Sequence, residues 1–166
     1  MRKINWLLLL LISTGSFAQL SVSRLQTENQ LFPFGIDITQ PRFSWQLNSP
    51  VRNTMQTAYE LKVLLDKKAV WQTGKTSSGQ SVFISYGGAR LESNQRYSWQ
   101  VRVWDNQGKS SAWSQPAFFH TGLLQPTDWK ASWIEDGFTE DSINRPAQYF
   151  RKPFTLNKKI KSATAY

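Results

Sequence analysis

The chain has 166 residues, with 20 Lys and Arg against 11 Asp and Glu, one His and no Cys. That length allows about one domain, or one domain with the start of a second, and it excludes a barrel enzyme of about 250 residues. The lack of Cys excludes disulfides, thiolate nucleophiles and Cys-based metal sites, and a single His excludes a His-cluster site. Aromatic residues make up 14% of the chain, which predicts a packed core.

The first eighteen residues are typical of a secretory signal peptide. Arg2 and Lys3 supply positive charge, residues 6–12 form an apolar run, and Ser16-Phe17-Ala18 is a small-x-small cleavage site. The run is too short to span about 30 Å of hydrocarbon, although an N-terminal membrane anchor is the alternative. We expect cleavage after Ala18, no membrane segment in the mature chain, and a periplasmic or secreted location.

The next elements in chain order are segments in which apolar and polar residues alternate. The clearest are residues 42–47, 58–65 and 96–103. Alternation with a period of two predicts strands that have one buried and one solvated face. The residues expected in the core are Phe43, Trp45, Tyr59, Leu61, Val63, Tyr97, Trp99, Val101 and Val103.

Turn residues separate these segments from shorter predicted strands. Short strands are expected at residues 70–72 and 81–86, and a returning strand carries Trp113 and then Phe118-Phe119 after a hairpin at residues 105–108. Seven or so short strands over about 100 residues are typical of an immunoglobulin-like sandwich. Because a Cys pair is absent, the fibronectin type III variety fits best. We therefore predict an all-β, antiparallel sandwich over residues 19–122.

The composition changes after Gly122. Residues 123–147 read as a linker with a short apolar segment at 129–134, followed by an acidic, turn-rich stretch. A new strand is expected at residues 148–156, as the start of an incomplete second β-sandwich over residues 148–166. We interpret the sequence as a fragment of a longer protein.

The basic residues are scattered, whereas a nucleic-acid surface would concentrate them in a stripe or cluster. The densest group is Lys158, Lys159 and Lys161, near Arg151 and Lys152. We interpret it as a solvated strand edge, where Lys discourages edge-to-edge pairing. No nucleic-acid partner is expected.

The sequence offers few candidates for catalysis. Hydrolysis of a glycoside needs two carboxylates about 5 to 10 Å apart across a cleft. The adjacent pairs Glu135/Asp136 and Glu140/Asp141 fall in the linker, so we interpret them as solvated loop charges. His120 is expected to be a structural or exposed residue at a strand end. We name no catalytic, metal-binding or cofactor-binding residue and expect no cofactor.

Tryptophan can also stack on sugar rings, so each exposed Trp is a candidate contact. Trp45 and Trp99 fall on the inward phase of their strands and are expected in the core. Trp104 is out of phase with Trp99, and Trp71 lies on a short strand near an edge. For Trp104 and Trp71 the alternatives are a carbohydrate contact and, more commonly, packing between domains.

An ordered series of motifs runs through most of residues 20–166. Its members are Leu25-Gln26-Thr27-Glu28, Pro33-Phe34-Gly35-Ile36-Asp37, Pro41-Arg42-Phe43-Ser44-Trp45, Gln56-Thr57-Ala58-Tyr59-Glu60-Leu61-Lys62-Val63, Trp71-Gln72-Thr73-Gly74-Lys75, Tyr97-Ser98-Trp99-Gln100-Val101-Arg102-Val103-Trp104-Asp105 with Gly108, Trp113-Ser114, Asp128-Trp129-Lys130-Ala131 with Trp133-Ile134, and Phe150-Arg151-Lys152-Pro153-Phe154. This series resembles the N-terminal region of bacterial α-L-rhamnosidases of glycoside hydrolase family 78.

The resemblance implies a fibronectin III-like module followed by a larger β-sandwich that starts near residues 150–152. It also implies an (α/α)₆ barrel, outside this chain, whose acidic residues carry out an inverting acid/base mechanism. The longer protein would release terminal α-L-rhamnose from glycans or glycosides. This chain would be a non-catalytic accessory domain that packs against downstream domains, and the missing domains would hold the carbohydrate substrate.

The alternative is a stand-alone exported module, fibronectin III-like, for carbohydrate binding or adhesion. The reading frame beyond Tyr166 discriminates the two hypotheses. A long open frame favours the hydrolase, whereas a stop codon favours the module or a pseudogene.

Overall fold

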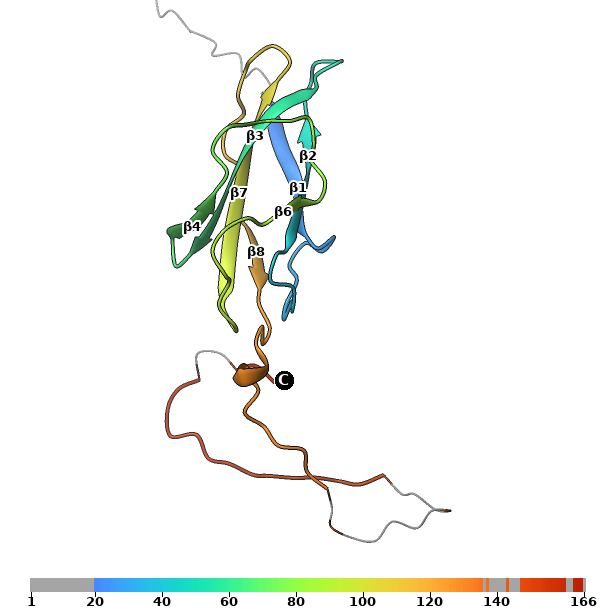
Figure 1. The fold of residues 1–166 in the computed structure, drawn as a ribbon, viewed down its shortest axis with the longest axis vertical. Helices are drawn as coiled ribbons and strands as arrows, with labels where there is room; N and C mark the ends of the chain where they lie inside the picture. The colour runs from blue at the N-terminus through green and yellow to red at the C-terminus, as the bar shows by residue number, and fades with distance from the viewer. Residues whose placement is uncertain (1–19, 136, 138–142, 144–146, 161–162, 166) are drawn as a thin grey trace, which may run out of the picture. The chain divides into compact units, whose positions relative to one another are not determined.

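The computed structural model describes residues 20–135, 137, 143, 147–160 and 163–165 (Figure 1). The chain divides into two compact units, one ending at Trp129 and the other beginning at Lys130. The expected signal peptide, residues 1–18, lies outside the described residues.

The first unit is an antiparallel sandwich of two sheets (Figure 1). The three-stranded sheet has the order β1–β2–β6, and the five-stranded sheet has the order β4–β3–β7–β8 with β5 added to β3. The strands are β1 (Ser21–Thr27), β2 (Arg42–Asn48), β3 (Gln56–Leu65), β4 (Lys68–Gln72), β5 (Thr76–Ser77), β6 (Ile84–Ser85), β7 (Arg96–Asp105) and β8 (Ala117–His120). Every pairing between named strands is antiparallel, which confirms the predicted immunoglobulin-like, all-β class.

The core lies between the sheets and is built on aromatic rings. All nine residues predicted to be in the core are buried. Trp99 is at its centre, with its ring centroid 4.7 Å from that of Phe43, and its indole N–H donates to Thr27 Oγ1 at 3.0 Å. The ring centroid of Trp45 lies 5.3 Å from that of Tyr59 in the facing sheet. Aromatic packing of this kind replaces the disulfide that immunoglobulin domains use to join their sheets.

The returning strand begins only at Ala117, so Trp113 lies outside it. Two other strands differ from the prediction because single residues have left-handed backbones. The strand expected at residues 81–86 contracts to Ile84–Ser85, since Phe83 has a φ of 57° that turns the chain. The sequence pattern predicts no strand before residue 42, but β1 precedes that position within the predicted sandwich. A bulge between Ser23 and Gln26, with Arg24 at a φ of 48°, breaks the period of two in β1 and hides it from pattern analysis.

The hairpins follow ordinary turn chemistry. Asp66 and Lys67 both have positive φ, as a two-residue turn between β3 and β4 requires. The predicted turn at residues 105–108 is confirmed: Asp105 Oδ1 accepts from the backbone N–H groups of Gln107 at 2.9 Å and Lys109 at 2.8 Å. Gly108 supplies the positive φ of 77°.

The segment that follows β8, up to Trp129 at the end of the first unit, is held to the sandwich by hydrogen bonds. Leu124 N–H donates to Ser93 Oγ at 2.8 Å, and the Ser93 hydroxyl in turn donates to the carboxylate of Asp128. Asp128 closes the short 3-10 helix Pro126–Asp128 by accepting from Gln125 N–H at 3.0 Å. Residues 123–129 therefore belong to the ordered unit.

The second unit contains no strand or helix among its described residues. The strand expected at residues 148–156 does not form there, because a strand needs a partner for its backbone hydrogen bonds and its apolar face. Tyr149, Phe150, Phe154 and Leu156 are correspondingly exposed. Across the whole described chain, no helix has the length and apolar character needed to cross a membrane.

Candidate interaction surfaces

The carboxylates considered for catalysis form no described site. Glu135 is exposed, and Asp136, Glu140 and Asp141 lie outside the described residues. Three surface cavities on the sandwich are lined without any Asp or Glu. Within the described ranges, no group of three or more His, Asp or Glu side chains could hold a metal ion.

The carboxylates of the sandwich instead have structural partners. Glu28 accepts from the guanidinium of Arg42 at 2.6 and 3.2 Å and from the Arg42 backbone N–H at 2.6 Å, and these hydrogen bonds hold the pKa of Glu28 below its ordinary value. Glu60 accepts from Arg102 Nε at 2.7 Å and from Gln72 Nε2 at 2.9 Å. Both carboxylates are therefore engaged in local contacts with an arginine of the sandwich.

Trp71 covers the edge of the core. Its ring centroid lies 5.0 Å from that of Tyr86, in an edge-on arrangement, and 6.4 Å from that of Phe43. The turn at Gly87 and Gly88 passes so close that a Cβ on Gly88 would lie 2.6 Å from the Trp71 Cβ. Trp71 is therefore a packing residue on the edge of the sandwich.

Trp104 lies on the outer face of the five-stranded sheet, where we define a cation–aromatic ladder of Lys62, Trp113, Arg102, Trp104 and Lys75. Lys62 Nζ lies 4.2 Å from the Trp113 ring, Arg102 Cζ lies 4.9 Å from Trp113 and 5.1 Å from Trp104, and Lys75 Nζ lies 4.7 Å from Trp104. Each of the two rings therefore has two cations beside it, and these contacts stabilise the outer face of the sheet.

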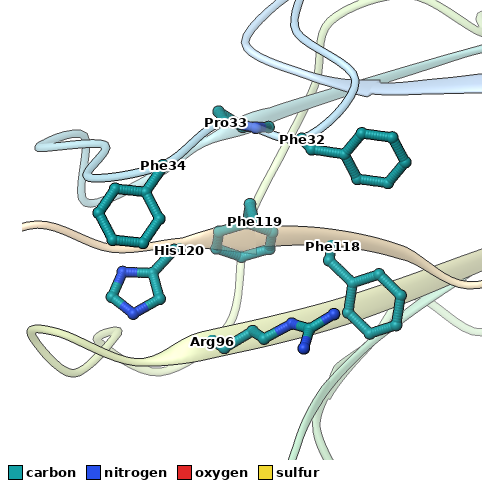
Figure 2. A pocket seen from close by; sticks show the side chains of 7 residues that line it. All are labelled: Phe32, Pro33, Phe34, Arg96, Phe118, Phe119 and His120. Carbon is teal, nitrogen blue, oxygen red and sulfur yellow. The ribbon is translucent and has the colours of Figure 1, made fainter. Parts of the chain in front are cut away.

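A second aromatic surface, not predicted from the sequence, lies along β8. We call it the β8 groove: a cavity of about 300 Å³ whose lining includes Phe32, Phe34, Arg96, Phe118 and His120. Figure 2 shows the Phe32–Phe34 loop on one side, with Arg96, Phe118 and His120 on the other.

The loop and β8 are held together by backbone hydrogen bonds. His120 N–H donates to Pro33 O and Ile36 N–H donates to His120 O, both at 3.0 Å. The His120 ring stacks on Phe34, with the centroids 4.4 Å apart and the planes within 18°. His120 is thus a strand-end residue that is half-buried against Phe34, close to its predicted structural role.

The signal for the groove was present but weak in the sequence. Phe118 lies on the phase opposite to the buried Phe119, and Phe32 and Phe34 are apolar residues in a turn-rich segment. The pairing of β7 with β8 places Arg96 directly opposite His120 and so brings these segments to one surface.

Comparisons with known proteins agree with this fold. The family model described as the Rha78A-like, N-terminal immunoglobulin domain matches residues 22–125. A curated α-L-rhamnosidase of Formosa agariphila is 37% identical over 147 residues, which are 81% of this chain and 16% of the relative. An α-L-rhamnosidase of Streptomyces avermitilis is 40% identical over 107 residues, covering 61% of this chain and 10% of the relative.

Solved structures give the same result. The crystal structure of the Streptomyces avermitilis α-L-rhamnosidase complexed with L-rhamnose has a TM-score of 0.67 at 37% identity, over 70% of this chain and 12% of that one. The α-L-rhamnosidase from Dictyoglumus thermophilum also has a TM-score of 0.67, at 38% identity, over 69% and 14% of the two chains. The chain belongs to the Rha78A-like N-terminal immunoglobulin domain family, and it spans only a small part of these relatives.

Proposed function

We propose that this member of the family is the N-terminal, non-catalytic domain of an α-L-rhamnosidase that releases terminal α-L-rhamnose from glycosides or glycans. The observation that carries the proposal is the match to an N-terminal domain family together with 34 to 40% identity to α-L-rhamnosidases, of which the chain covers only 10 to 17%. In such a protein the inverting acid and base, and the substrate site, belong to domains outside this chain.

The side chains of the sandwich support a non-catalytic role. Glu28 and Glu60 accept hydrogen bonds from arginines. Asp105 accepts hydrogen bonds within a turn, and Asp128 accepts one at the 3-10 helix. An inverting pair needs one protonated and one ionised carboxyl facing a common substrate, about 6.5 to 9.5 Å apart. These four carboxylates are each held in separate local structures.

Export is the second part of the proposal. Residues 1–18 would direct secretion and be removed after Ala18, leaving a periplasmic or secreted product that packs against downstream domains of its own chain. The charged n-region, short apolar run and small-residue site support this. N-terminal sequencing of exported material checks it, and a mature protein that keeps residues 1–18 would contradict it.

The enzymatic part is tested on the gene product. The reading frame that contains this chain is followed to its stop codon, and the encoded protein is assayed with 4-nitrophenyl α-L-rhamnoside, with the α-D-glucoside as the control substrate. The proposal expects a frame that continues well past Tyr166 and a product that hydrolyses the rhamnoside alone. A stop codon directly after Tyr166 would favour the stand-alone module, and a longer product without rhamnosidase activity would refute the enzymatic proposal.

A further inference from the structure

We propose that the β8 groove binds a carboxylated sugar unit, a uronate residue within a glycan. The proposal rests on the proposed function, since a domain of a glycoside hydrolase meets such glycans. The groove combines apolar aromatic rings with the guanidinium of Arg96 and with a ring nitrogen of His120 that can accept a hydrogen bond. That combination fits a pyranose ring bearing a carboxylate better than it fits a neutral sugar or an apolar segment.

Apolar rings form the walls of the groove. Phe32 is 72% exposed and Phe34 is 64% exposed, and Phe118 is half-buried across the groove from them (Figure 2). Phe32 and one face of Phe34 are therefore accessible, whereas the other face of Phe34 stacks on the His120 ring. The C–H face of a pyranose is apolar and can pack on such rings, while its polar edge stays free for hydrogen bonds.

Arg96 supplies the cationic fork. Its Cζ lies 4.2 Å from the Phe118 ring centroid, so the guanidinium is held over the aromatic wall. Unlike Arg42 and Arg102, which pair with Glu28 and Glu60, Arg96 forms no ion pair within the described part of the chain. No carboxylate lines the groove, and a guanidinium binds a carboxylate through two parallel hydrogen bonds.

His120 supplies the acceptor. Its Nδ1 lies 2.9 Å from the carbonyl oxygen of Thr121. Because a carbonyl can only accept, Nδ1 carries the proton, and in the neutral ring Nε2 is left as an acceptor. Stacking on Phe34 and the contact with Thr121 O hold the ring in place. In the proposal Nε2 accepts from a hydroxyl of the glycan, and Arg96, beside Phe118, binds the carboxylate.

The inference is tested by NMR titration of the isotope-labelled 166-residue chain with methyl β-D-glucuronide. Methyl β-D-glucoside is the matched neutral probe, because it differs only at C6. A ligand of this size supports a Kd on the order of 1 mM. We expect saturable shifts at the amides of Arg96, Phe118 and His120, and binding of the glucoside that is weaker by about tenfold or more, as loss of a charge-assisted pair implies.

Two variants complete the test. Arg96→Gln removes the fork and should weaken glucuronide binding by about tenfold, whereas Arg52→Gln, at another exposed arginine, should leave it unchanged. Unaltered amide dispersion in both variants shows that the sandwich is intact. Equal binding of the two sugars, no saturable shift with the glucuronide, or equal effects of the two variants would each overturn the inference.

The outcome is separable from that of the proposed function. The titration contains no catalytic step, so its failure beside a hydrolytically active longer protein would refute only the groove site. Binding of the glucuronide beside an inactive longer protein would refute only the enzymatic proposal.

Discussion

Replacing Thr27 by Val isolates the polar contact at the centre of the core. Thr27 is 1% exposed and Trp99 is fully buried, and the indole N–H of Trp99 donates to Thr27 Oγ1 at 3.0 Å. Valine keeps the shape of threonine but leaves that N–H without an acceptor and away from water. The expected loss of stability is about 1 to 3 kcal/mol, the cost of an unsatisfied buried donor. Removing the whole ring, by Trp99→Ala, should cost about 3 to 5 kcal/mol.

Urea unfolding followed by tryptophan fluorescence measures these losses. Thr39→Val, at an exposed threonine, is the matched control and should change stability by no more than about 0.5 kcal/mol. In a Trp99→Phe background the Thr27 hydroxyl has already lost its donor, so Thr27→Val should there be neutral or stabilising. An equal cost of Thr27→Val in both backgrounds would refute the assigned hydrogen bond.

Two further predictions concern other parts of the sandwich. Gly88→Ala should destabilise the domain by about 1 to 3 kcal/mol, because the added Cβ would lie 2.6 Å from the Trp71 Cβ. Gly87→Ala is the control and should be near neutral, because its Cβ would lie 3.4 Å from the Trp71 ring. Equal melting temperatures of the two variants would contradict this prediction. Hydrogen bonds from Arg42 hold the pKa of Glu28 below its ordinary value of 4.5, so the stability advantage of wild type over Glu28→Gln should be full above pH about 4.5 and shrink as the pH falls through the lowered pKa. Melting curves between pH 7 and 3 check the sign, and a pH-independent difference would argue against the pairing.

β7 was predictable because its residues alternate between the core and the partly exposed outer face along its whole length. β3 pairs with β7 and keeps the same inward phase at Tyr59, Leu61 and Val63, although Glu60 on its other face is also buried, against Arg102 and Gln72. The outward position of Trp104 followed from the same phase. β1 and the 81–86 segment were not predicted correctly, because Arg24 and Phe83 adopt left-handed backbones that propensity does not foresee in such residues.

The surfaces were harder to predict because their residues come from distant segments. The β8 groove brings Phe34 beside His120, and the ladder places Trp113 beside Lys62. Neither contact follows from spacing along the chain. Both contacts depend on the order and register of the strands, and these are known only once the two sheets have been assembled.

We expect this chain to have no rhamnosidase activity of its own. The direct measurement is nitrophenol release from 4-nitrophenyl α-L-rhamnoside by the purified 166-residue chain. We predict no release above the buffer blank. Nitrophenol release that persists after purification to homogeneity would contradict this expectation. If Glu135→Gln abolished that release and Glu92→Gln, a control at an exposed glutamate of the sandwich, did not, the active site would lie in the segment after the sandwich.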